Sequence, residues 1–195
     1  MKINIVFTGP PSAGKTTSFE DLKSKLENIN FYQEISREII KKSIETGSDV
    51  LPWENAQEFD REVVNARLND YLDNKNLLKT RQGLNIKIYD RSPIDTYAYS
   101  KKFECLEPNT IQICRTLKYD LIFFFPFEEG IFTQDDERKE SAQLAQELES
   151  HLMDSYKEHN NEIVIVDFNT IENRSNFIIQ EIERRLNLEL DRKIY

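Results

Sequence analysis

The chain has 195 residues, of which 38% are hydrophobic, and this length allows one domain, residues 1–195, with a substantial core. Its 26 basic and 35 acidic residues give a net charge of −9, so we expect no broad duplex DNA-binding surface, which needs clustered basic residues. We expect a cytoplasmic protein that does not enter a membrane, because we find no long apolar run, no leader before the first predicted strand and no zinc-site spacing of the cysteines.

The first predicted element is a buried strand at residues 3–7, which are mostly apolar and β-branched. Residues 9–16 follow it and read Gly-x-x-x-x-Gly-Lys-Thr, the complete spacing of a phosphate-binding loop. Apolar residues at 19, 22 and 26 then form a helical stripe. Because strand, loop and helix come in this order, we interpret the motif as a functional phosphate loop and not as a chance glycine-rich turn.

The residue types in this loop suit phosphate chemistry. Gly9 and Gly14 let the backbone turn sharply and approach an anion closely. Lys15 is expected to bring its charge to the β- and γ-phosphates, and Thr16 to hold Mg²⁺ through its hydroxyl. Backbone amides and the positive end of the next helix complete the predicted site. The predicted nucleotide-binding residues are Gly9, Ser12, Ala13, Gly14, Lys15, Thr16 and Thr17.

The rest of the chain alternates between apolar strands and helical stripes. The predicted strands occupy residues 3–7, 31–34, 85–89, 121–125 and 163–167. The predicted helices occupy about 18–26, 35–44, 54–81, 94–101, 108–117, 144–159 and 171–186. This alternation predicts an α/β fold, in which a five-stranded parallel sheet is flanked by helices on both faces.

Charged residues follow several of these strands, at the edge of the sheet where such folds bind ligands. Asp90 ends the third strand and is followed by Arg91. Next to a phosphate loop, a carboxylate in this position holds Mg²⁺ or takes the acceptor proton, and the arginine meets a phosphate or a developing charge. The competing interpretation of Asp90 is a helix N-cap before Ser-Pro.

A second acidic residue, Glu34, ends the second strand, and Arg37 lies one helical turn later. Glu34 is either an acid or general base of the acceptor site or a carboxylate that stabilises the start of a helix. Asp167 ends the fifth strand, where an aspartate before a turn is common. These positions predict that the phosphate loop and up to three acids converge on one edge.

Two further candidates lie outside the strand ends. Trp53, the only tryptophan, either stacks on a ring of the acceptor or anchors its loop. Residues of about 128–142 are acidic and mixed, and we interpret them as a lid that passes from a mobile loop into a helix. Arg138 in that lid is expected to reach the phosphates, and the alternative is a solvated helix start among acidic neighbours.

These motifs together resemble those of the P-loop nucleoside and nucleotide kinases. Thymidylate kinases carry a similar Asp-Arg followed by Ala-Tyr, as at Asp90-Arg91 and Ala98-Tyr99. The overall pattern is most similar to the small, AAA-labelled domains of the nicotinamide riboside kinase-like group. The shared features are Glu34-x-x-Arg37, a Leu-Pro-Trp stretch at 51–53, Asp90-Arg91 and a Gln-Asp-x-x-Arg-x-Glu lid at 134–140.

The resemblance implies a three-layer P-loop NTPase fold of nucleotide-kinase type, with ATP or another nucleoside triphosphate and Mg²⁺. It also implies a helical acceptor region at about 35–81, with the acceptor held by Glu34, Arg37, Trp53 and Arg91. The implied catalytic residues are Lys15, Glu34, Asp90, Arg91 and Arg138, with Thr16 and Asp90 at the metal. The lid has fewer arginines than the lids of adenylate and thymidylate kinases, so the resemblance does not fix a nucleoside monophosphate as acceptor.

Three functions follow from these features. The first is a phosphotransferase that moves the γ-phosphoryl group of ATP·Mg²⁺ to a nucleoside- or nucleotide-like acceptor. The second is an ATPase that acts as a nucleotide-dependent switch or binding module. The third is a kinase for a nucleic acid end, which the net charge of −9 disfavours. The acceptor and the oligomeric state are not predicted, because fold does not determine function.

Overall fold

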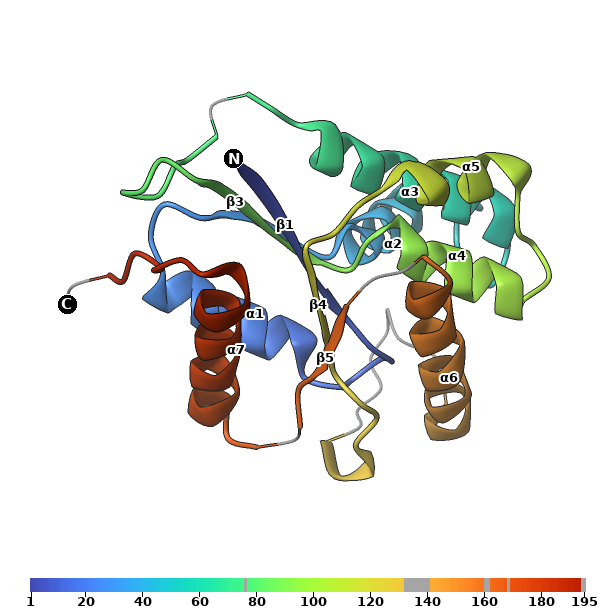
Figure 1. Ribbon diagram of the computed structural model, residues 1–195. Helices are drawn as coiled ribbons and strands as arrows, with labels where there is room; N and C mark the ends of the chain where they lie inside the picture. The colour runs from blue at the N-terminus through green and yellow to red at the C-terminus, as the bar shows by residue number, and fades with distance from the viewer. Residues whose placement is uncertain (76, 132–140, 160–161, 168, 194–195) are drawn as a thin grey trace.

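The computed structural model describes residues 1–75, 77–131, 141–159, 162–167 and 169–193. Its centre is a parallel sheet of five strands in the order β2-β3-β1-β4-β5 (Figure 1). The strands are β1 (Lys2–Thr8), β2 (Asn30–Tyr32), β3 (Asn85–Asp90), β4 (Leu121–Phe124) and β5 (Ile163–Ile165). The five-stranded parallel sheet predicted from the sequence is confirmed.

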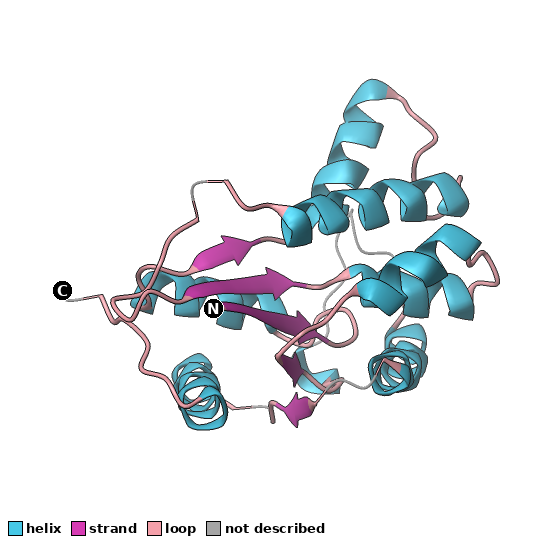
Figure 2. Cartoon of the chain, turned by 45° about the horizontal axis from the view of Figure 1, so that its top comes forward, coloured by secondary structure: helices cyan, strands magenta, loops and turns pink. Residues whose placement is uncertain are grey.

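Helices cover both faces of this sheet, which makes a three-layer α/β fold (Figures 1 and 2). The helices are α1 (Lys15–Lys25), α2 (Ile35–Thr46), α3 (Ala56–Leu72), α4 (Pro93–Lys102), α5 (Pro108–Thr116), α6 (Ala142–Glu158) and α7 (Ile171–Leu186). Helices α1 and α7 contact each other on one face, and α4 packs against α3, α5 and α6 on the other. None of the helices within the described ranges is long and apolar enough to span a bilayer.

The side-chain alternation of β1 explains why this strand lies in the middle. Ile3, Ile5 and Phe7 are buried in the cluster that contains the apolar faces of α1 and α7. Val6 points the other way, into a cluster with residues of α4 and α6. Because β1 is apolar on both faces, it is stable only where helices cover both sides of the sheet.

The prediction of a long helix at about 54–81 is wrong at the C-terminal end, because α3 ends at Leu72. Lys87, a fully buried residue of β3, donates hydrogen bonds from Nζ to the carbonyls of Asp70 (2.8 Å) and Tyr71 (3.1 Å). A lysine at the C-terminal end of a helix satisfies carbonyls that have no partner within the helix. This cap comes from a distant strand, so the local sequence does not reveal it.

Strand pairing brings the two central motifs together. In the β1–β3 pair, Phe7 lies opposite Asp90. The phosphate loop begins two residues after Phe7, and Arg91 follows Asp90 and donates its backbone N–H to the carbonyl of Phe7 (2.9 Å). The loop and Asp90 are therefore neighbours at the carboxyl ends of the parallel strands. Open α/β sheets bind ligands at this edge, at the point where the strand order reverses.

Phe7 offers a test of the core beside this edge. It is fully buried, and its ring lies 5.3 Å from that of Phe125 and 5.6 Å from that of Phe123. We expect Phe7→Ala to lower the free energy of unfolding by about 3–5 kcal/mol, because it removes a large buried side chain and leaves a cavity. Urea denaturation followed by circular dichroism measures this loss.

Phe177→Ala is the matched control. Phe177 lies on α7 with 38% of its surface exposed, so its removal should change the free energy of unfolding by only about 0.5 kcal/mol. Equal losses in the two variants would contradict the placement of the core.

Candidate nucleotide site

The phosphate loop joins β1 to α1 through two glycines with positive φ. Gly9 has φ 140°, and a Cβ at this position would lie 2.1 Å from the carbonyl oxygen of Phe125. Gly14 has φ 81° and occupies the N-cap of α1, where it brings no side chain. The first amides of α1 therefore lack a side-chain cap and are available to an anion, as in other phosphate loops.

Lys15 and Thr16 follow at the start of α1. The Lys15 side chain is buried, and its Nζ donates hydrogen bonds to the carbonyls of Gly9 (2.9 Å) and Pro10 (2.6 Å). The Thr16 hydroxyl donates to Oδ2 of Asp90 at 2.8 Å. The contact joins the loop after β1 to the end of β3, so the two residues predicted to hold Mg²⁺, Thr16 and Asp90, lie side by side.

Asp90 is buried and only partly hydrogen-bonded. Its Oδ2 accepts the Thr16 hydroxyl, whereas its buried Oδ1 has no hydrogen-bond partner among the described residues. Burial raises the pKa of Asp90, and the nearby charge of Glu34 raises it further, to about 6. The carboxylate is thus ionised at neutral pH and has one oxygen left to bind a ligand.

Glu34 has a different environment, because two arginines bind it. It accepts hydrogen bonds from Arg67 (2.6 Å), from Nε of Arg91 and from the hydroxyl of Ser36 (2.7 Å). Burial alone would raise the pKa of Glu34, but the charges of Arg91 and Arg67 outweigh it and lower the pKa to about 2. Glu34 is also the N-cap of α2, so the helix-start interpretation describes its backbone position.

Arg91 is fixed by several contacts. Its backbone is left-handed, with φ 73°, and its side chain is only 8% exposed. Besides Glu34, it binds Asp95 (3.1 Å) and lies 5.7 Å from the centre of the Tyr99 ring. The N-cap of α4 is Ser92 and not Asp90, since Ser92 and Asp95 form a capping box there. Asp90 is thereby available to the site.

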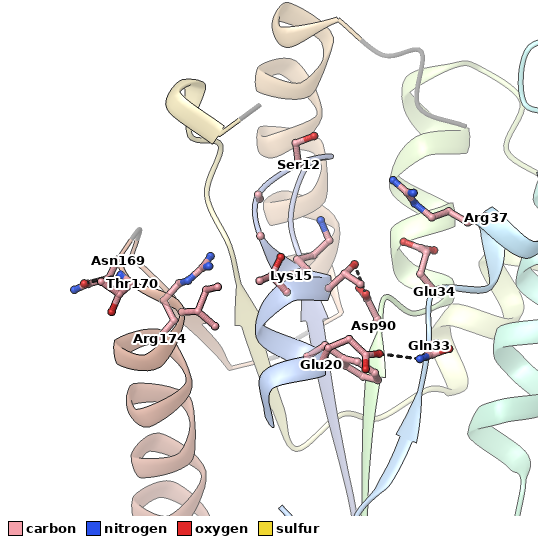
Figure 3. A pocket seen from close by; sticks show the side chains of 16 residues that line it. Ser12, Lys15, Glu20, Gln33, Glu34, Arg37, Asp90, Asn169, Thr170 and Arg174 are labelled. Atoms are coloured by element: carbon pink, nitrogen blue, oxygen red, sulfur yellow. Dashed lines mark hydrogen bonds between the residues drawn. The ribbon is translucent and has the colours of Figure 1, made fainter. Parts of the chain in front are cut away.

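Two cavities open at this edge of the sheet. The larger, of about 840 Å³, lies over the phosphate loop and is bounded on the other side by the start of α7 (Figure 3). It is lined by Ser12, Ala13, Gly14, Lys15, Thr16, Thr17, Phe19, Glu20, Gln33, Glu34, Arg37, Asp90, Asn169, Thr170, Ile171 and Arg174. Every predicted nucleotide-binding residue except Gly9 lines this cavity.

The smaller cavity, of about 340 Å³, lies between α2, α3 and α4. Trp53, Phe59, Tyr99 and Phe103 give it aromatic walls, and it also contains charged residues of both signs. Glu34 and Arg37 line both cavities, so the two meet at these residues. A site of this size, with mostly apolar walls and a few polar groups, suits one small molecule.

The remaining predicted residues are placed as follows. Trp53 is 39% exposed and lines the smaller cavity. Asp167 is exposed and lines neither cavity. Arg138 and most of the predicted lid at about 128–142 lie outside the described residues.

The sequence analysis missed several charged residues of the site. Arg67 and Asp60 lie on α3 and line the smaller cavity, and Asp95 of α4 holds Arg91 there. Arg174 of α7 lines the larger cavity. A polar helix face contains many charges, and only the three-dimensional fold shows which of them point inward.

A phosphate loop with a buried carboxylate beside it, on this five-stranded parallel sheet, defines a P-loop domain with the three-layer α/β fold of nucleotide kinases. The chain belongs to the AAA_28 family, described as an AAA domain, whose model matches residues 4–174. The resemblance inferred from the motifs is thereby confirmed. A search of curated proteins found no match.

Solved structures show the same fold. A NadR protein in complex with NR matches with a TM-score of 0.72 at 20% identity, over 100% of this chain and 54% of that one. The chain thus spans about half the length of that NadR protein. Thymidylate kinase from Candida albicans matches with a TM-score of 0.63 at 21% identity, over 99% of this chain and 98% of its own. Deoxyadenosine kinase from M. mycoides matches with a TM-score of 0.64 at 13% identity, over 93% and 100%.

The ion pairs of Glu34 predict a measurable contribution to stability. We expect Glu34→Gln to lower the free energy of unfolding by about 3–5 kcal/mol at pH 7, because it leaves the buried Arg67 without its counter-charge and the buried Arg91 with Asp95 alone. Urea denaturation at several pH values measures the difference from wild type.

The pH dependence has a definite sign. The pKa of Glu34 is lower in the folded protein than in the unfolded chain, so the stabilisation is complete above the ordinary pKa of 4.5 and is lost as pH falls towards 2. The difference between wild type and Glu34→Gln should therefore shrink in acid. Glu38→Gln, at an exposed position of α2, is the control and should be nearly neutral. A loss no larger than in this control would contradict the assignment.

Proposed function

We propose that this protein is a phosphotransferase, which moves the γ-phosphoryl group of ATP·Mg²⁺ to a small nucleoside- or nucleotide-like acceptor. One observation carries the proposal: the cavity over the phosphate loop meets a second, aromatic-walled cavity at Glu34 and Arg37. A switch-type ATPase needs only the first cavity. A transferase needs two sites that open onto each other, because donor and acceptor must be in line at the transferred group.

The donor side uses the phosphate loop. The amides at the start of α1 bind the phosphate oxygens, and Lys15 turns from the carbonyls of Gly9 and Pro10 to the β- and γ-phosphates. The cavity of about 840 Å³ is large enough for a nucleoside triphosphate. The family and the folds of the matched kinases support this assignment.

The metal would be held by Thr16 and Asp90. Their contact at 2.8 Å and the unpartnered Oδ1 of Asp90 fit a hard cation, which prefers hydroxyl and carboxylate oxygens. Mg²⁺ held by these two residues would offset the negative charge of the donor phosphates. Because Asp90 is ionised above about pH 6, these two residues hold the cation at neutral pH.

The acceptor occupies the smaller cavity. Trp53 and Tyr99 offer aromatic surfaces for a ring. Arg37 lines both cavities, and Arg91 lines the smaller one and binds Glu34. The matched structures support a nucleoside-like acceptor by analogy: they are a thymidylate kinase, a deoxyadenosine kinase with dCMP and dCDP bound, and a NadR protein with NR.

The two carboxylates have different roles in the proposed reaction. Glu34, with its low pKa, stays ionised and holds Arg67 and Arg91 in place. Asp90 is ionised at neutral pH and holds the cation together with Thr16. The acceptor oxygen loses its proton to one of these two carboxylates and forms a bond to the γ-phosphorus, the bond to the β–γ bridging oxygen breaks, and ADP leaves. Arg91 offsets the charge that develops.

Removal of Lys15 tests the proposal. Purified protein is incubated with ATP·Mg²⁺ and a panel of nucleosides, nucleoside monophosphates, nicotinamide riboside and short oligonucleotides, and mass spectrometry detects an added phosphate. We expect phosphorylation of at least one small acceptor, and Lys15→Ala should lower kcat/KM by about 10²–10³-fold, as expected for loss of a preorganised charge.

Lys23→Ala, at an exposed position of α1, is the control and should retain full activity. If wild type forms only ADP and phosphate at a rate that no acceptor changes, the protein is a switch-type ATPase instead. Full transfer activity in Lys15→Ala would contradict the whole assignment.

The pH profile tests the role of Asp90. Only the ionised carboxylate of Asp90 holds the cation, so kcat/KM at a Mg²⁺ concentration well below saturation should fall about tenfold per pH unit below about pH 6. The control removes the two histidines of the sequence, His151 and His159, which line neither cavity. The double variant His151→Gln/His159→Gln should therefore keep the same profile. Loss of the acid limb in this variant, or a flat wild-type profile down to pH 5, would contradict the assignment to Asp90.

A further inference from the structure

Arg174 occupies an unusual place beside the phosphate loop. It lies in the first turn of α7 and points from there towards the loop, across the cavity from Glu34 and Arg37 (Figure 3). A Cβ on Gly14 would lie 2.2 Å from its Nη1, so the guanidinium occupies the space that a side chain at residue 14 would need. Arg174 is therefore in contact with the loop backbone itself.

This guanidinium has no counter-charge in the part of the chain that the structure describes. Arg174 is only 6% exposed, and its buried Nε makes no hydrogen bond there. Burial lowers its pKa, and no charge among the described residues opposes the shift. The other two buried arginines of the site, Arg67 and Arg91, each bind Glu34. Within the described residues, Arg174 thus differs from them in carrying a buried charge with no compensating partner.

An uncompensated buried charge destabilises a folded protein, since the cost of removing it from water is not recovered. An anion in the adjoining cavity removes that cost, and the loop amides on the other side of Gly14 are themselves suited to phosphate. The Thr170 hydroxyl caps the start of α7 and accepts from Asn173 N at 3.2 Å. Of the residues that line this wall, Asn169, Thr170, Ile171 and Arg174, only Arg174 carries a charge.

We propose that Arg174 binds the phosphate chain of the donor nucleotide from the α7 side of the loop. The inference rests on the proposed function, because it needs a nucleoside triphosphate in the larger cavity. A guanidinium binds phosphate oxygens in a bidentate manner, whereas a neutral base stacked on it leaves its charge uncompensated. The phosphates are thus held from two sides, by Lys15 and the amides of α1 and by Arg174.

The proposal predicts opposite effects on binding and on stability. Arg174→Met keeps much of the length and the apolar stem but removes the charge. The free protein should unfold at the same or a higher urea concentration, because an uncompensated buried charge is gone. Binding of Mg·ADP and of tripolyphosphate, measured by calorimetry, should weaken about 10- to 100-fold for both ligands, because the lost contact is to phosphate. Arg174→Lys, which keeps the charge, should lose less affinity.

Arg184→Met is the matched control. Arg184 lies on the same helix, is 62% exposed and pairs with Glu181, so this variant should bind both ligands like wild type. Wild-type affinities in Arg174→Met would overturn the inference and leave the proposed function intact. Weakened ADP binding with unchanged tripolyphosphate binding would also overturn it, because the contact would then be to the nucleoside. Failure of wild type to bind either ligand would overturn both the inference and the proposed function.

Discussion

The hydrogen bond between Thr16 and Asp90 depends on the pairing of two strands that lie far apart in the sequence. Parallel pairing of β1 with β3 sets Phe7 opposite Asp90, and this register places the loop after β1 beside the carboxylate that ends β3. A shift by one residue would turn Asp90 to the other face of the sheet, away from the loop. The apolar residues that fix this register are therefore as important to the site as the polar residues within it.

Charge compensation arranges the rest of the site. Glu34 and Asp95 hold Arg67 and Arg91 through buried ion pairs, so these arginines are oriented before any ligand binds. The two carboxylates also differ in pKa. The arginines stabilise the charge on Glu34 and lower its pKa, whereas burial and the charge of Glu34 raise the pKa of Asp90. Such preorganisation lowers the reorganisation needed during a reaction.

The sequence predicted the sheet, the loop and the edge at which Asp90 and Glu34 meet, because strand periodicity and the loop spacing are local signals. It failed where the signal is not local. The end of α3 depends on Lys87, which lies on β3, and the local sequence of α3 therefore gave no reason to end it at Leu72. Arg67 and Arg174 were missed for the same reason, because only the packing of a helix shows which of its charged residues face inward.

The contact between Gly14 and Arg174 also bears on how the site is assembled during synthesis. It joins the loop after the first strand to the last helix of the fold. A nascent chain that has emerged only as far as β5 already contains every residue of the phosphate loop, but one wall of its cavity is still missing. The nucleotide site is therefore complete only after α7 has docked against α1. The N-terminal motif alone does not form it.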